Sequence, residues 1–293
     1  MLKTVAIYIT YQPNIDLLKK SIYGLISQVN QIIIVDNTPN REKMLETLKN
    51  DKIEIIYLED NYGIAYAQNI GIKRVLEDGA DYILLSDQDT IYPSKYVEKM
   101  VECFKDNKVC AAGPLFIDAQ TGKVQYFIKK GLNGFKKIYP KSGKNEVFQL
   151  IASGTIINVS YINEIGLMKE ELFIDWVDME WCWRALKKGY KIIGNADVVI
   201  EHFHGENSKR ILTKNITLKS SVRYYYTIRN GVYLALHVNV LNIYRRAILF
   251  FKTFRNIFLF PIFSHNPLLD LRYTLKGFYH GLIGRLGKLD KDH

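Results

Sequence analysis

The chain has 293 residues, of which 48% are hydrophobic, so it can bury a sizeable core and is too apolar for a disordered protein. Its formal charge of +10 is concentrated at one end: residues 207–293 contain 15 Lys and Arg against three Asp, whereas residues 1–206 are close to neutral. This distribution argues against a nucleic-acid-binding protein and leaves an anionic surface as the expected partner of the basic tail alone.

Cysteine usage and the first residues indicate the compartment. Cys103, Cys110 and Cys182 form no Cys-x-x-Cys pair, which favours a reducing environment and argues against zinc. The chain begins directly with a strand pattern and lacks the apolar core and cleavage site of a signal peptide. We therefore expect a cytoplasmic protein.

Short apolar runs alternate with helical patterns along the first 90 residues. The runs that we predict to be strands are residues 4–10, 32–35, 53–58 and 82–85. Alternation at this spacing predicts βαβ units with right-handed crossovers. The expected fold is α/β, with a mostly parallel, Rossmann-like sheet flanked by helices.

Each of these four strands ends in polar side chains. In order, they are Thr10 with Tyr11, Asp36 with Asn37, Asn61 with Gly63, and Asp87 with Asp89. Because parallel strands share one carboxyl edge, these groups should converge on one crevice and bind a nucleotide there. Each residue taken alone could equally be a cap or a turn residue. No Gly-x-Gly-x-x-Gly motif or P-loop occurs, which argues against a dinucleotide oxidoreductase or an ATPase.

The pair Asp87 and Asp89 is the central feature of the sequence. Two carboxylates just beyond a buried strand suit Mg²⁺ or Mn²⁺, which would take further oxygens from a substrate diphosphate. A capped turn is the alternative interpretation.

The chain beyond Asp89 continues with a further series of predicted elements. They are a helix over 94–104, a strand over 109–114, a hairpin or mobile loop over 118–148, a strand over 149–157 and a strand over 190–200. The small residues Ser153 and Gly154 leave room either for a ligand or for a neighbouring helix.

Several motifs together resemble the family 2 nucleotide-sugar glycosyltransferases, which have the GT-A fold. They are Ile9-Thr10-Tyr11-Gln12-Pro13, Val35-Asp36-Asn37, the Asn61-x-Gly63-x-Ala65-x-Ala67-x-Asn69-x-Gly71 series, and Asp87-x-Asp89. The bacterial rhamnosyltransferase branch is most similar, over residues 3–206. The resemblance implies metal-dependent, inverting transfer of rhamnose from dTDP-rhamnose, or of another UDP- or dTDP-linked sugar, to a lipid-linked saccharide in surface polysaccharide synthesis.

The resemblance also implies a catalytic base and a third metal ligand. Aligning Arg184 with the arginine that ends the family's acidic motif places Asp178 at the position of the base. Val177 departs from the glutamate of many relatives, which leaves Asp175 as an alternate base. His202 matches a histidine that contacts metal or diphosphate, with His204 as its substitute.

The predicted site can be summarised by function. The expected donor-binding residues are Thr10, Tyr11, Asp36, Asn37, Asn61, Gly63, Asn69, Asp87 and Gln88. The expected metal ligands are Asp87, Asp89 and His202, and the expected acceptor-binding residues are Ser153, Gly154 and Trp176. A nucleotidyltransferase is a second enzyme hypothesis, disfavoured because no Lys-bearing glycine loop follows the first strand.

Two domains are expected, a catalytic domain over 1–206 and a helical, basic and aromatic extension over 207–293. The segment 243–263 contains six Phe, but Lys252, Arg255 and Pro261 make it a poor membrane span. An interfacial helix on anionic lipid at the inner face of the cell membrane fits this pattern. Packing on the sheet or in a homodimer is the alternative, and both can hold.

Overall fold

The computed structural model describes residues 2–39, 44–118, 122, 124–131, 134–202, 208–211, 214–217 and 219–290, with the backbone alone for residues 44, 118, 202, 208–211 and 214–217. The predicted site residue His202 is thus described by its backbone only, and His204 lies outside the described residues.

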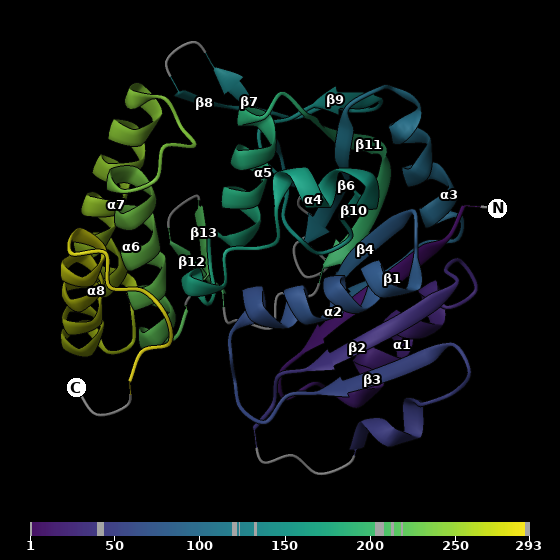
Figure 1. Ribbon diagram of the computed structural model, residues 1–293. Helices are drawn as coiled ribbons and strands as arrows, with labels where there is room; N and C mark the ends of the chain where they lie inside the picture. The colour runs from purple at the N-terminus through teal and green to yellow at the C-terminus, as the bar shows by residue number, and fades with distance from the viewer. Residues whose placement is uncertain are drawn as a thin grey trace.

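Strands and helices follow one another as shown in Figure 1. The strands are β1 (Thr4–Thr10), β2 (Gln31–Asp36), β3 (Ile53–Tyr57), β4 (Tyr82–Asp87), β5 (Thr90–Ile91), β6 (Val109–Asp118), β7 (Phe127–Gly131), β8 (Gly134–Ile138), β9 (Lys144–Glu146), β10 (Ile156–Asn158), β11 (Lys191–His202), β12 (Ser208–Ile211) and β13 (Lys214–Thr217). The α-helices are α1 (Ile15–Leu25), α2 (Ile64–Asp78), α3 (Tyr96–Val101), α4 (Ile162–Ile165), α5 (Val177–Lys187), α6 (Ser221–Leu236), α7 (Ile243–Phe263) and α8 (Pro267–Leu282). Short 3₁₀ turns span Met44–Leu48, Glu102–Lys105, Val159–Tyr161 and Glu170–Leu172.

The main sheet has the order β3-β2-β1-β4-β10-β6-β11-β5, with β9 added on β11. Strands β1 to β4 are parallel, as are β6 and β11, whereas β10 runs antiparallel between β4 and β6. The mostly parallel α/β sheet expected from the sequence is therefore confirmed.

Alternate side chains of the strands enter two hydrophobic layers. Val5, Ile7 and Leu85 face α2 and α5, whereas Ala6, Tyr8 and Leu84 face α1 and α3. Successive side chains of a strand point to opposite faces of the sheet, and here both faces are covered. Each strand is therefore a continuous apolar run in the sequence.

One predicted strand is wrong over most of its length. Of residues 149–157, only 156 and 157 belong to a strand, β10; Gln149 forms an isolated antiparallel bridge with Ile128, and residues 150–155 are irregular. Gly154 adopts φ +73°, and its N–H donates to Leu85 O (2.8 Å), so the chain turns across the end of β4 there. The hairpin interpretation of 118–148 fits β7 and β8, which pair antiparallel.

Helices α6, α7 and α8 form a bundle beside the sheet (Figure 1). Gly231 of α6 lies against Thr253 of α7, and Gly277 of α8 lies against the Tyr225 carbonyl. The chain then returns to the part that contains the sheet, where Gly287 N–H donates to Glu171 O (2.9 Å) and Lys288 pairs with Asp60. In the part of the chain that the structure describes, no helix has the length and apolar character needed to cross a bilayer.

Candidate active site

The carboxyl ends of β1, β2 and β4 lie side by side, as the sequence predicts. In the strand register Thr10 is opposite Asp36, and Ile9 is opposite Asp87. Paired strands are about 5 Å apart, so the polar ends of these three strands form one continuous edge.

Asp36 is buried and anchors the start of this edge. Its Oδ1 accepts hydrogen bonds from the hydroxyls of Thr10 (3.0 Å) and Thr38 (2.7 Å). Next to it, the Tyr11 N–H donates to Gln88 Oε1 (2.9 Å), which joins the segment after β1 to the turn after β4. Four predicted donor-binding residues, Thr10, Tyr11, Asp36 and Gln88, thus lie together.

Asn37 and Asn61 connect the end of β2 to the start of α2. Asn37 Nδ2 donates to Asn61 Oδ1 (2.9 Å), which also accepts the Gly63 N–H (3.0 Å). Gly63 has φ +86°, and a Cβ there would lie 2.5 Å from Phe173 O. Glycine is therefore required for both conformation and close approach.

Asn69 has a different place from its predicted neighbours. Its Nδ2 donates to Met168 O (2.9 Å) and Glu170 Oε1 (2.8 Å), and its Oδ1 accepts the Met168 N–H (2.8 Å). The side chain is buried, and its amide connects residues 168–170 to α2. In this structure Asn69 therefore has a structural role beside the sheet edge.

The turn 152–154 brings the aspartate motif and the predicted base together. Asp87 N–H donates to Ser153 Oγ (3.2 Å), and the neighbouring Ala152 N–H donates to Asp178 Oδ2 (3.2 Å). Two residues in sequence therefore contact Asp87 on one side and Asp178 on the other. The irregular turn that replaces the expected strand is what places Asp178 near the sheet edge.

Asp178 has the properties of a general base. Burial raises its pKa to about 6; hydrogen bonds from Met179 N–H and Ala152 N–H oppose that rise, while the charges of Asp175 and Asp87 add to it. A carboxylate with a pKa close to neutrality is ionised at pH 7 and still accepts a proton in a transition state.

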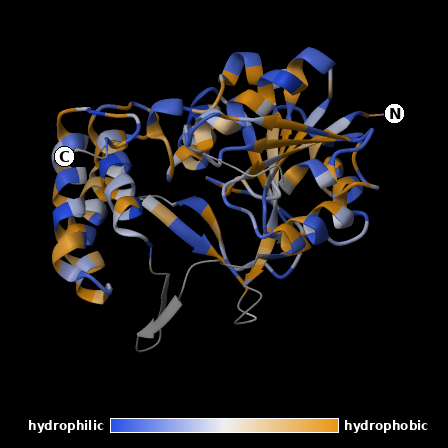
Figure 2. Cartoon of the chain, turned by 90° about the horizontal axis from the view of Figure 1, so that it is seen from below, coloured by the Kyte–Doolittle hydropathy of each residue, from blue (hydrophilic) through white to orange (hydrophobic). Residues whose placement is uncertain are grey.

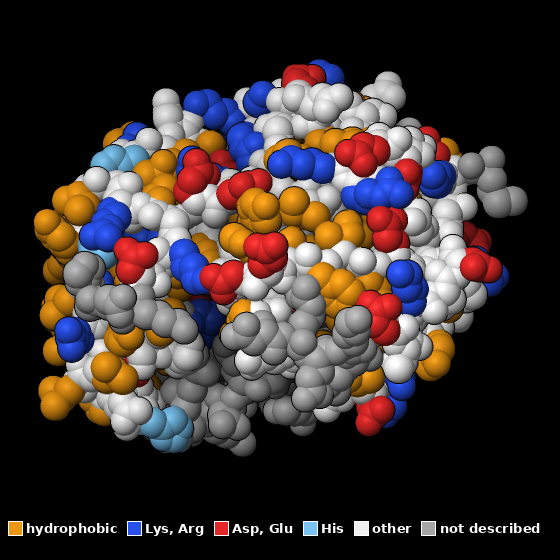
Figure 3. All heavy atoms as spheres, turned by 60° about the horizontal axis from the view of Figure 1, so that its bottom comes forward, with side chains coloured by type: hydrophobic (Ala, Val, Ile, Leu, Met, Phe, Trp, Pro, Cys, Tyr) orange, Lys and Arg blue, Asp and Glu red, His pale blue; other side chains and the backbone are white. Residues whose placement is uncertain are grey.

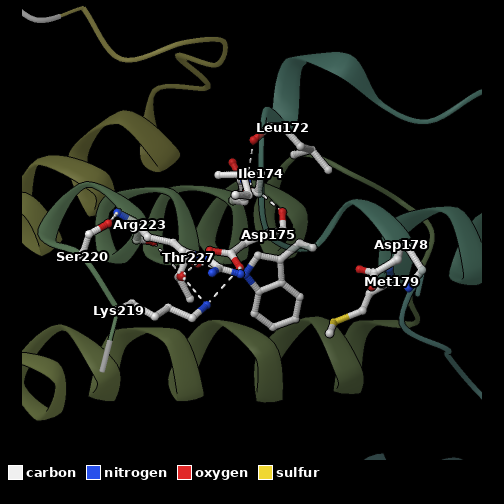
Figure 4. Close-up of polar contacts among 12 residues, drawn as sticks. Leu172, Ile174, Asp175, Asp178, Met179, Lys219, Ser220, Arg223 and Thr227 are labelled. Carbon is white, nitrogen blue, oxygen red and sulfur yellow. Dashed lines mark hydrogen bonds and ion pairs between the residues drawn. The ribbon is translucent and has the colours of Figure 1, made fainter. Parts of the chain in front are cut away.

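Asp175 lies in a different environment, which Figure 4 shows. Burial alone would raise its pKa, but Lys219 and Arg223 outweigh burial and lower it. Lys219 Nζ is 2.9 Å from Oδ1, Arg223 Nη2 is 3.4 Å from the same oxygen, and Thr227 Oγ1 donates to Oδ2 (2.8 Å). Asp175 is thus held as a paired anion, whereas Asp178 carries the raised pKa that a base requires.

The residues present fit a divalent cation in their chemistry. Asp87 and Asp89 supply hard oxygens at the end of β4, and the His202 backbone pairs with Thr90, the residue after Asp89. Within the described residues, no group of three or more His, Cys, Asp or Glu side chains is assembled as a metal site. A diphosphate and water would therefore have to complete the coordination.

The predicted acceptor residues are all engaged in packing. Ser153 is buried, and its hydroxyl shares a hydrogen bond with that of Thr90 (2.6 Å). A Cβ on Gly154 would lie 2.8 Å from Ile200 and 2.9 Å from Tyr96, so this glycine provides room for packing. Trp176 is half-buried, and its Nε1 donates to Thr227 O (2.9 Å).

The sequence interpretation missed the contribution of α6. Lys219, which precedes α6, contacts Asp175 together with Arg223 and Thr227 of the helix, and Arg229 and Asn230 contact the backbone just before α5. The available signal was an arginine and an asparagine in the middle of an otherwise apolar helix, which usually marks a buried polar cluster.

A separate cavity lies away from this site. It has a volume of about 520 Å³ and lies between β7, the C-terminal half of α5 and the start of α7; its lining includes Lys129, Phe148, Trp183, Lys187 and Arg245. None of the predicted site residues lines it. The candidate site is thus defined by the sheet edge and the turn 152–154.

Comparison with known proteins agrees with this geometry. Residues 6–166, which include the ends of β1 to β4 and the turn 152–154, match the model of the family described as glycosyl transferase family 2. The chain belongs to this family. The protein is therefore an enzyme, a glycosyltransferase. A relative from Shigella flexneri named dTDP-rhamnosyl transferase RfbF confirms the resemblance to the rhamnosyltransferase-like branch. That relative is 37% identical over 237 residues, which are 78% of each chain.

More distant proteins share parts of the chain or its fold. The low-salt glycan biosynthesis hexosyltransferase Agl10 of Haloferax volcanii is 22% identical over 66% of this chain and 64% of its own. Crystal structures of GalNAc-T7 with UDP, GalNAc and Mn²⁺ (TM-score 0.61, 15% identity, 92% of this chain and 59% of that one) and of S. aureus TarS 1–349 (0.59, 14%, 97% and 82%) have the same fold. The GT-A-like fold expected from the sequence is thus confirmed.

Proposed function

We propose that this glycosyltransferase transfers rhamnose from dTDP-rhamnose, with inversion, to a lipid-linked saccharide in the synthesis of a bacterial surface polysaccharide. The observation that carries the proposal is the 37% identity, over 78% of both chains, to a relative named dTDP-rhamnosyl transferase. Another UDP- or dTDP-sugar is the alternative donor, since the fold also accommodates UDP and GalNAc in GalNAc-T7.

In the proposed reaction the oxygen of an acceptor hydroxyl forms a bond to the anomeric carbon of the donor sugar. Asp178 accepts the proton of that hydroxyl as the bond forms. The bond from that carbon to the diphosphate breaks, and dTDP leaves from the opposite face. A single displacement with one base inverts the anomeric configuration, in contrast to the two carboxylates of retaining glycoside hydrolysis. Asp175, held by two cations, keeps the local charge near Asp178 fixed.

The donor would occupy the edge formed by β1, β2 and β4. In this proposal Asp36 and Asn37 bind the nucleobase, and the segment from Asn61 to Gly63 binds ribose and phosphate. Asp87 and Asp89, with His202, would hold Mg²⁺ or Mn²⁺, which neutralises the charge that develops on the departing diphosphate. A bound Mn²⁺ in GalNAc-T7, which has the same fold, supports this assignment.

A lipid-linked acceptor requires the enzyme to work at the cytoplasmic surface of a membrane, and the outer face of α7 and α8 suits that task. Exposed residues of α7 include Phe251, Phe254, Phe258, Ile262 and Arg255, and those of α8 include Leu268, Leu275, Tyr279, Leu282 and Arg272. We call these ten residues the outer apolar face. Both stripes point away from α6, and hydrophobic side chains are visible along this edge of the molecule (left in Figure 3).

The charges on these helices select an anionic lipid surface over a neutral one. Between residues 243 and 282 the only acidic residue is Asp270, which is buried, whereas Arg255 and Arg272 are exposed within the apolar stripes. Aromatic and aliphatic side chains that surround a cation are typical of helices lying in the headgroup region. Figure 2 shows the same mixture of hydrophobic and hydrophilic residues on the C-terminal helices.

A donor panel tests the proposal. The purified protein is incubated with dTDP-rhamnose, UDP-GalNAc or UDP-glucose, a lipid-linked saccharide and Mg²⁺, Mn²⁺ or EDTA, and nucleoside diphosphate and product are measured. We expect dTDP-rhamnose to be the preferred donor and EDTA to abolish transfer. Asp178→Asn should lower kcat by about 10²–10⁴-fold with donor affinity nearly unchanged.

Two further variants sharpen this test. Asp89→Ala should remove metal-dependent donor binding, whereas Asp16→Asn, an exposed carboxylate in the first turn of α1, should change neither binding nor transfer. Equal turnover by the Asp178→Asn variant and the wild type would exclude Asp178 as the base.

A further inference from the structure

The segment 172–176, which leads into α5 and Asp178, has an unusual backbone. Phe173, Asp175 and Trp176 have φ values of +65°, +62° and +68°, although none of them is glycine. Such conformations cost free energy in L-residues and persist only where the surroundings enforce them. Something outside this segment must therefore hold it.

The holding contacts come from two adjacent residues of α6. Asn230 Nδ2 lies 2.8 Å from Leu172 O, 2.8 Å from Ile174 O and 3.0 Å from Asp175 O, and thus faces three carbonyls of the segment. Arg229 Nη2 donates to Leu172 O (2.8 Å) and Glu171 O (3.2 Å). Side chains of α6 thus donate hydrogen bonds to the carbonyls of Leu172, Ile174 and Asp175 in this irregular backbone.

Arg229 also determines which way the Asn230 amide points. Its Nε donates to Asn230 Oδ1 (2.8 Å), so the oxygen faces the guanidinium and the NH₂ group faces the segment. Both side chains are fully buried, and the guanidinium lies over the rings of Tyr225 and Tyr226. A residue pair that is buried and mutually bonded in this way has little freedom to adopt another geometry.

The same segment contacts the donor side of the site. Phe173 O lies against Gly63, and it accepts the Ala65 N–H of α2 (3.4 Å). At its other end the Asp175 carboxylate is held by Lys219, Arg223 and Thr227 (Figure 4). Segment 172–176 is thus the point where the donor-binding edge, the base and the C-terminal helices meet.

We propose that Asn230, oriented by Arg229, is a positioning residue for catalysis: it holds segment 172–176 in its left-handed conformation and so sets the place of Asp178 relative to the donor edge. This inference rests on the proposed function in so far as Asp178 is the base. It makes the C-terminal extension a part of the active site and assigns it a task besides membrane contact.

The variant that tests the inference is Asn230→Asp, which keeps the size of the side chain and can still accept from Arg229 but cannot donate to the three carbonyls. We expect kcat to fall by about 10²-fold, because small displacements of a reacting group have effects of that size. Donor affinity should stay within about threefold of wild type, because we expect the donor-binding edge near Gly63 to change little. Hydrogen exchange of the amides of 171–176 should become faster.

A milder variant and a matched control complete the design. Thr227→Val removes one hydrogen bond to Asp175 with little change in shape, and it should lower kcat less than Asn230→Asp does. Asn256→Asp makes the same chemical change at a half-buried position of α7 and should leave kcat unchanged. The pH dependence of kcat separates positioning from folding: its acidic limb should move in Asn230→Asp and stay in Asn256→Asp.

The inference is overturned if folded Asn230→Asp protein keeps the kcat, the pH profile and the 171–176 exchange rates of the wild type. A fall in kcat that merely follows the folded fraction would overturn it as well. If the wild-type protein transfers no sugar from any donor, the proposed function fails, but exchange in 171–176 still decides whether Asn230 holds the segment.

Discussion

Asp175 and Asp178 are three residues apart and differ in the groups that surround them. Two cations and a threonine hydroxyl hold Asp175 in its ionised form, whereas the hydrogen bonds that Asp178 accepts from described residues come from the backbone N–H groups of Ala152 and Met179, with two other carboxylates nearby. Environments that move the pKa values of neighbouring carboxyls in opposite directions are a common way to separate a structural anion from a base.

The raised pKa of Asp178 predicts a dependence of both rate and stability on pH. The rate should fall below about pH 6, where the base becomes protonated. Since the ordinary pKa is about 4, the folded wild type binds the proton more tightly than the unfolded chain. Its free energy of unfolding therefore decreases as the pH rises from about 4 to about 6.

Replacing Asp178 by Asn removes this titration. Relative to wild type, Asp178→Asn should gain about 1–2 kcal/mol of stability above pH 6, allowing for the partial exposure of the side chain, and should lose this gain as the pH falls to about 4. Urea unfolding at pH 4 and pH 8 measures it. A difference that is independent of pH would contradict the raised pKa.

At the scale of elements, two irregular segments determine the site. The turn 152–154 connects Asp87 to Asp178, and segment 172–176 connects Gly63 to α5. Regular strands and helices supply the rigid frame, but loops at the carboxyl edge of the sheet place the reactive groups.

Gly63→Ala tests the contact between two of these segments. A Cβ there would meet Phe173 O at 2.5 Å, and the φ of +86° is unfavourable for alanine. We expect a loss of at least about 1–2 kcal/mol in unfolding free energy together with a fall in kcat, both measurable on the same preparation.

Gly79→Ala is a control for alanine at a positive φ, because Gly79 has φ +67° and ψ +55° with no atom within 4 Å of the added Cβ. This left-handed conformation costs alanine less than the φ +86° and ψ +161° of Gly63, so Gly79→Ala should lose less stability and leave kcat unchanged. Equal kcat values for the two variants would show that the Phe173 contact has no influence on the site.

At the scale of the whole molecule, the C-terminal bundle has two faces in different surroundings. Its inner helix α6 contacts the segment before Asp178, and its outer apolar face is exposed. Residues 219–290 thus contact the part of the chain that contains the sheet, including the ion pair of Lys288 with Asp60. The predicted division into two domains at residue 206 stays a prediction.

Membrane binding is tested by flotation with vesicles. The protein should float with vesicles that contain anionic lipid, less with neutral ones, and less at 1 M salt than at 0.1 M, because the Debye length falls from about 10 to about 3 Å. The double variant Phe251→Ser and Phe258→Ser should weaken binding.

Tyr23→Ser, which removes an exposed aromatic side chain from α1, should leave vesicle binding unchanged. If the protein fails to float and instead sediments as a dimer that the Phe251 and Phe258 changes dissociate, the outer apolar face is a subunit interface.

The sequence by itself determined the parallel sheet and its polar edge, because the period of apolar residues and the polar residue at each strand end are local properties. Thr10, Asp36 and Asp87 needed only the rule that parallel strands end at the same side. Only the tertiary structure decided that Asn69 is a tether, that Asp175 is a paired anion and that Arg229 and Asn230 hold the segment before Asp178. Each of these roles depends on a partner more than 40 residues away in the chain. A hydrogen bond or an ion pair between such distant residues leaves no pattern in the local sequence.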